Sequence, residues 1–142
     1  MKENLRRKFK ISSYIENLDD AGLSSGDVEK TETLPEGTLE ISDGKIRIFY
    51  EERGEGGEVK TEIVADGGGV TVARRGAINN VMHFVEGERH ESLYEIPPYS
   101  FDTAVYTRKI RNSVSESGGR IEIFYTMTIG GQIKNVRMKI EV

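Results

Sequence analysis

The chain of 142 residues contains no cysteine and no tryptophan, and it has only three prolines and two histidines. The absence of cysteine excludes disulfides, thiolate nucleophiles and cysteine-ligated zinc or iron centres. No apolar run approaches the roughly 20 residues that a membrane-spanning helix needs. The first ten residues are mostly polar or charged and do not form the apolar stretch of a signal peptide. We therefore expect a cytoplasmic protein with no membrane partner.

An excess of positive charge is also missing. The 20 lysines and arginines stand against 24 aspartates and glutamates, which gives a formal net charge of -4. This balance argues against nucleic acid as a partner. Hydrophobic residues make up 36% of the chain and charged residues 31%, which favours strands with one buried and one exposed face. The length fits a single domain over residues 1–142.

Apolar and polar residues alternate along most of the chain, and this period of two predicts β-strands. We expect strands over residues 5–15, 28–34, 38–41, 46–50, 59–65, 70–74, 81–85, 92–96, 101–114, 121–129 and 133–142. Asp43-Gly44 predicts a tight hairpin turn, because both residues tolerate positive φ. A second hairpin is expected around residues 86–88. The polar segment 17–27 predicts a turn or loop, with a short helix as the alternative.

The connections between these strands are too short for parallel crossovers, so neighbouring strands should be antiparallel. An open sheet of this size would leave two long unpaired edges, which closure removes. We therefore predict an all-β fold, an antiparallel up-and-down barrel of about 8–10 strands whose first and last strands pair. The interior of such a barrel is either filled by side chains or able to hold one small ligand.

Residues 74–87 read RRGAINNVMHFVEG, followed by SLY at 92–94 and PPY at 97–99. With these Arg-x-Gly, Met-x-Phe, Ser-x-Tyr and Pro-Tyr elements, the chain resembles the YwiB-like family of uncharacterised bacterial calycin-like β-barrel proteins. Ser100 replaces the glycine of the family's Pro-Tyr-Gly element. The resemblance implies a calycin-like barrel, the architecture of lipocalins and fatty-acid-binding proteins, and it carries over no activity. The Gly-x-Trp signature of lipocalins is absent, because the chain has no tryptophan.

Arg74 is the main candidate for a ligand-binding residue. It follows Val70 and Val72 at a period of two, so its side chain shares their face. Inside a barrel, a guanidinium needs a carboxylate or a ligand anion as its partner. The alternative is that Arg74 lies at a strand end before Gly76 and keeps its charged head in water.

Hydroxyl groups could complete an apolar cavity, since small-molecule sites need only a few polar groups. The candidates are Tyr94, Tyr106, Tyr125, Thr103 and Thr107. The alternative is a set of packed tyrosines whose hydroxyls reach the rim of the barrel.

The sequence contains no convincing catalytic or metal-binding pattern. His83 and His90 lack the spacing of a zinc site, and Ser92 near His90 has no identifiable orienting acid. The glycine-rich segments 54–57 and 67–69 are not followed by the Lys-Ser/Thr of a phosphate-binding loop, so they are interpreted as hairpin connections. We expect no enzymatic activity, no metal and no cofactor.

A basic outer surface suggests an alternative function. Pairing of the first and last strands would bring together Arg6, Arg7, Lys8, Lys10, Lys134, Arg137 and Lys139. Such a surface could bind a protein or RNA, with Phe9 or Tyr14 stacking on bases. It could equally protect edge strands from aggregation. A small, partly apolar or anionic ligand in the interior is the leading prediction, and the surface interaction is the alternative.

Overall fold

The structure is a computed structural model that describes residues 3–142, with side chains described from Arg6 onward. Leu5, in the first expected strand, therefore lies outside the described side chains. The strands are β1 (Glu3–Lys8), β2 (Lys10–Leu18), β3 (Ser24–Thr33), β4 (Glu36–Ser42), β5 (Lys45–Gly54), β6 (Gly57–Asp66), β7 (Gly69–Gly76), β8 (Asn80–Phe84), β9 (Arg89–Ile96), β10 (Tyr99–Asn112), β11 (Arg120–Ile129) and β12 (Gln132–Glu141). None of the described residues forms a helix long and apolar enough to cross a membrane.

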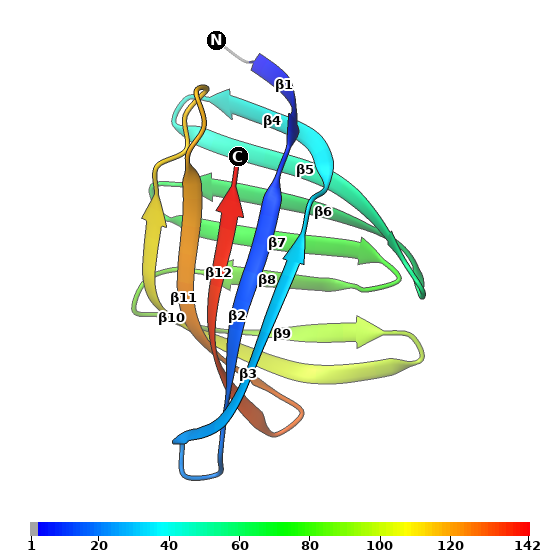
Figure 1. Cartoon of the computed structure of the whole chain (residues 1–142), viewed down its shortest axis with the longest axis vertical. Helices are drawn as coiled ribbons and strands as arrows, with labels where there is room; N and C mark the ends of the chain where they lie inside the picture. Colours follow the sequence, from blue (N-terminus) through cyan, green and yellow to red (C-terminus); the bar gives the residue numbers. More distant parts are fainter. Residues whose placement is uncertain (1–2) are drawn as a thin grey trace.

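The strands form two antiparallel six-stranded sheets. The first sheet has the order β1-β4-β5-β6-β7-β8 and the second has the order β3-β2-β12-β11-β10-β9. In Figure 1, β2, β3, β11 and β12 run lengthwise in front of the first sheet, whose strands cross them steeply. The all-β antiparallel class is confirmed. The predicted pairing of the N-terminal and C-terminal strands is confirmed as well, since β2 pairs with β12 and places Ile11 opposite Ile140.

The hydrogen-bond ladder does not run all the way round the molecule, as it would in a closed barrel. On one side, segments 3–18 and 24–42 each pass from one sheet into the other. They bend together where the Phe9 amide donates to the Pro35 carbonyl at 2.8 Å. On the other side, the edges β8 and β9 are joined by the isolated bridge between Asn79 and Glu95. The bends divide segments expected to be single strands, so the count is 12 strands rather than 8–10.

The two predicted hairpins have different outcomes. The Asp43-Gly44 turn is confirmed, with φ values of 51° and 76°. The hairpin around residues 86–88 is wrong, because β8 and β9 belong to different sheets. The connection is instead attached to β10, where the Gly87 amide donates to the Thr107 carbonyl and Glu86 accepts the Ile110 amide. The segment 17–27 forms a turn between β2 and β3 and contains no helix.

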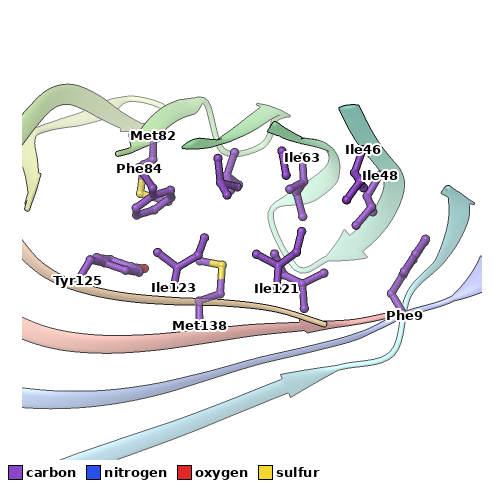
Figure 2. Close-up of a cluster of buried hydrophobic side chains, with 14 of the residues drawn as sticks. Phe9, Ile46, Ile48, Ile63, Met82, Phe84, Ile121, Ile123, Tyr125 and Met138 are labelled. Carbon is purple, nitrogen blue, oxygen red and sulfur yellow. The ribbon is translucent and has the colours of Figure 1, made fainter. Parts of the chain in front are cut away.

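The apolar faces of the sheets meet in a packed core (Figure 2). The first sheet contributes Ile46, Ile48, Ile63, Met82 and Phe84, and the second contributes Ile121, Ile123, Tyr125 and Met138. The rings of Phe84 and Tyr125 lie 4.7 Å apart between their centroids. Each large apolar side chain buried in this way stabilises the fold by about 1.5–3 kcal/mol. The core therefore holds the two sheets together and fills part of the space between them.

Candidate functional site

A cleft of about 600 Å³ opens between the sheets where this apolar packing ends. Tyr50, Thr61 and Arg74 line it from β5, β6 and β7 of the first sheet. The second sheet contributes small polar side chains, among them Ser13 of β2 and Thr31 of β3. Residues of this size cannot fill the space that isoleucine and phenylalanine fill elsewhere, so the inner faces remain apart at this end.

Arg74 is half-buried at the cleft, where β-sheet pairing places it between Thr61 of β6 and Asn80 of β8. Its side chain forms no hydrogen bond or ion pair with any residue in the part of the chain that the structure describes. The strand ends two residues later at Gly76, as the solvent alternative assumed. The guanidinium nevertheless lines an enclosed space, as the ligand-binding prediction requires.

Two buried tyrosines lie within electrostatic reach of Arg74. Burial raises the pKa of Tyr125 to about 12, with Arg74 acting against this rise and Tyr94 adding to it. Burial also raises the pKa of Tyr50, whereas Arg74 and a hydrogen bond with Thr61 act to lower it. At neutral pH both phenols are therefore uncharged, and Arg74 supplies the positive charge of this interior.

The other predicted ligand residues fall into separate places. Tyr94 is half-buried on the inner side of β9, close enough to influence Tyr125. Thr103 and Thr107 are buried, and the Thr107 hydroxyl has no hydrogen-bond partner among residues 3–142. Tyr106 is 45% exposed on the outer face, because its neighbours on β10 point inward. Tyr106 therefore does not line the interior, contrary to the prediction.

Sequence reasoning missed Tyr50, Thr61 and Asn80. The period of two could have found Tyr50, which follows Ile46 and Ile48 just as Arg74 follows its valines. Asn80 is only 4% exposed, and its Nδ2 donates to the Leu93 carbonyl at 3.0 Å across the gap between β8 and β9. That long-range contact has no signal in the local sequence.

The two histidines come together across the same gap, with ring centroids 5.9 Å apart. His83 Nδ1 lies 3.2 Å from the Thr71 hydroxyl, and His90 Nε2 lies 2.9 Å from a carboxylate oxygen of Glu88. No group of three or more His, Cys, Asp or Glu side chains that could hold a metal occurs among the described residues. This pair is therefore not a metal centre built by residues 3–142.

The proposed basic surface is divided between the sheets. Arg6 and Lys8 of β1 lie 3.9 and 3.7 Å from carboxylate oxygens of Glu36. Arg7 donates a hydrogen bond to the carbonyl of Glu116. These three cations belong to the first sheet and do not continue the basic side chains of β12.

The other members of that set separate by the parity of their strands. Arg137 and Lys139 lie with Lys10 around a hollow on the outer face of the second sheet. Lys134 lies opposite the inward-facing Met127, beside the tip of the β2–β3 turn. Of the two rings expected to stack on bases, Phe9 is buried in the core and Tyr14 is 53% exposed.

Comparisons with known proteins agree with this architecture. The chain is 29% identical over 132 residues to the uncharacterized beta-barrel protein YwiB of Bacillus subtilis (strain 168), covering 93% of this chain and 88% of YwiB. The crystal structure of the ywiB protein from Bacillus subtilis is similar with a TM-score of 0.73 and 26% identity, over 96% of this chain and 92% of that chain. The model of a domain of unknown function, DUF1934, matches residues 20–141. The resemblance seen in the sequence is confirmed, and the chain belongs to the YwiB-like family that this domain defines.

Proposed function

We propose that this is a non-enzymatic binding protein that holds a small, partly apolar anion in the cleft between its sheets. The observation that carries the proposal is Arg74, a half-buried guanidinium with no hydrogen bond or ion pair among residues 3–142. A carboxylate, sulfonate or phosphate group on the ligand would supply the missing partner. Charge-assisted hydrogen bonds of this kind are among the stronger ones in proteins.

The rest of the lining supports a ligand with an apolar body. Ile11, Ile78 and Ile96 lie around the cleft, while the hydroxyls of Tyr50 and Thr61 lie near the charge. Small-molecule sites usually combine apolar walls with a few polar groups, in cavities of roughly 300–1,000 Å³. The cleft, at about 600 Å³, falls in that range.

The calycin-like character that the sequence implies supports the same use of the interior, because lipocalin barrels hold one small ligand between their strands. The absence of cysteine fits a reducing, cytoplasmic setting, which is part of the proposal. Likeness of fold supports ligand binding only as an analogy, so the case depends on the residues of the cleft.

Titration with two probes tests the proposal: the fluorescent anion 1-anilinonaphthalene-8-sulfonate and, by thermal shift, decanoate against decanol. The variant is Arg74→Met. The matched control is Arg75→Met, which removes the same charge from the exposed neighbour on the same strand. We expect Arg74→Met to weaken binding of both anions about tenfold or more while decanol is unaffected. Equal behaviour of the two variants, or no saturable binding of either anion, would contradict the proposal.

A further inference from the structure

The outer face of the second sheet carries a row of alternating cations and aromatic rings. Lys30 of β3 lies opposite Tyr14 of β2, and Tyr14 lies opposite Arg137 of β12. Arg137 then lies opposite Phe124 of β11, which lies opposite Lys109 of β10. These five strands are four spacings wide, about 19 Å at roughly 4.8 Å per spacing. In Figure 1 no other strand lies in front of β2, β3, β11 and β12.

The groups in this row are available to a partner. Tyr14 is 53% exposed, and Tyr106, one step along β10 from the row, is 45% exposed. Lys30, Lys109 and Arg111 are exposed and form no ion pair with any residue from 3 to 142. A hollow of about 260 Å³ lies in the face between Tyr14, Lys30 and Arg137. The face therefore offers both free cations and open ring surfaces.

The carboxylates of this face are largely occupied. Glu122 is 1% exposed and accepts hydrogen bonds from Arg137, at 2.8 Å, while Arg120 lies 2.9 Å from its other oxygen. The hydrogen bond from Arg137 is the main reason that the pKa of Glu122 is lowered, so this carboxylate stays charged and holds Arg137 in place. Glu32 lies 3.6 Å from Lys10. The remaining cations of the row keep an uncompensated positive charge.

The rings are arranged for stacking as well as for charge. The guanidinium carbons of Arg137 and Arg111 lie 5.4 and 5.9 Å from the centroid of the Phe124 ring. Planar guanidinium groups and aromatic rings are both surfaces on which unpaired bases stack. The spacing of cations between the rings matches a ligand that alternates flat groups with negative charges.

We propose that this face binds single-stranded nucleic acid, with phosphates at Lys30, Arg137 and Lys109 and bases stacked on Tyr14 and Tyr106. Double-stranded nucleic acid keeps its bases paired and stacked on one another, so it could use the cations alone. An acidic protein would likewise use the cations but would gain little from the open rings. The net charge of -4 argued against such a partner, but a net charge averages over faces that differ.

Fluorescence anisotropy with a labelled oligouridylate of about 12 nucleotides tests the proposal, first at low salt. We expect Tyr14→Ala to weaken binding about tenfold, because stacking contributes strongly to each bound base. Lys30→Ala/Lys109→Ala should reduce the slope of log affinity against log salt by about 1.4, since each phosphate contact on a single strand contributes roughly 0.7.

Matched controls lie on the outer face of the first sheet. Phe49→Ala removes a ring that is 39% exposed, and Arg47→Ala/Lys60→Ala removes two exposed cations. Both should leave binding within about twofold, as should Arg74→Met in the cleft. The proposal is overturned if the oligouridylate does not bind at low salt, or if the controls weaken it as much as the test variants. It is also overturned if Tyr14→Ala has no effect and polyglutamate competes equally, which would identify a surface for acidic chains.

Discussion

Phe84 packs on Tyr125 at one end of the space between the sheets, whereas Ser13 and Arg74 line an open cleft at the other. Both ends are built by the same strands, and in both ends every second residue points inward. The difference lies in the side chains at those inward positions. Large apolar groups close one end, and small polar groups with one arginine leave the other end accessible.

The comparison separates residues that stabilise the fold from residues available for binding. The packed end buries apolar area and should account for most of the interior's contribution to stability. The cleft end holds an unpaired cation, which contributes little to stability and is useful only with a partner. Four predictions test this separation, from the largest expected effect on stability to the smallest.

Phe84→Ala should have the largest effect. Phe84 is fully buried, so its truncation removes apolar contacts and leaves a cavity. We expect the free energy of unfolding to fall by about 3–5 kcal/mol. Urea denaturation followed by circular dichroism measures the change. Val59→Ala, at the edge of the cleft, is the control and should cost about 1 kcal/mol or less; equal losses would remove the distinction between the two ends.

Tyr125 should make the packed end sensitive to alkali. Its pKa in the folded state is about 12, above the ordinary value of 10.0. Between pH 10 and 12 the unfolded chain therefore loses this proton while the folded chain keeps it, so stability falls as the pH rises. The loss should approach about 2–3 kcal/mol at pH 12. Tyr125→Phe, compared by urea denaturation across this range, should lose less; an unchanged pH dependence would contradict the assignment.

Glu122→Gln tests a buried charge outside the interior. The carboxylate is held by two arginines, and its pKa is lowered, so its contribution is complete above the ordinary value of 4.5 and is lost as the pH falls below it. We expect the variant to lose about 1–2 kcal/mol at pH 7 and to approach the parent protein on acidification. Thermal melts at pH 7 and at pH 3 measure both points. A deficit that does not shrink in acid would show that packing, not charge, is responsible.

Arg74→Met should have the smallest effect on stability. The guanidinium has no partner to lose among the described residues, and methionine keeps much of its apolar length. We expect the free energy of unfolding to change by about 0.5 kcal/mol or less in urea. A loss of 2 kcal/mol or more would mean that Arg74 is a structural residue, and the separation between the two ends would fail.

Much of the local structure could be predicted from the sequence. The period of two located most strands, and it placed Arg74 on the inner face with Val70 and Val72. Applied to β10, the same rule would have excluded Tyr106, which lies between the inward-facing Val105 and Thr107. That error came from not applying the rule, because the information was present in the sequence.

The sequence by itself determined where strands begin, which side chains share a face and where a turn such as Asp43-Gly44 reverses the chain. These properties depend on neighbouring residues and on backbone geometry. Only the tertiary structure decided which sheet each strand joins, where Phe9 bends the chain from one sheet to the other, and that β8 and β9 stay apart. Such choices depend on packing between residues distant in the chain, which no local pattern records. The cleft and the row of cations and rings exist because of those choices.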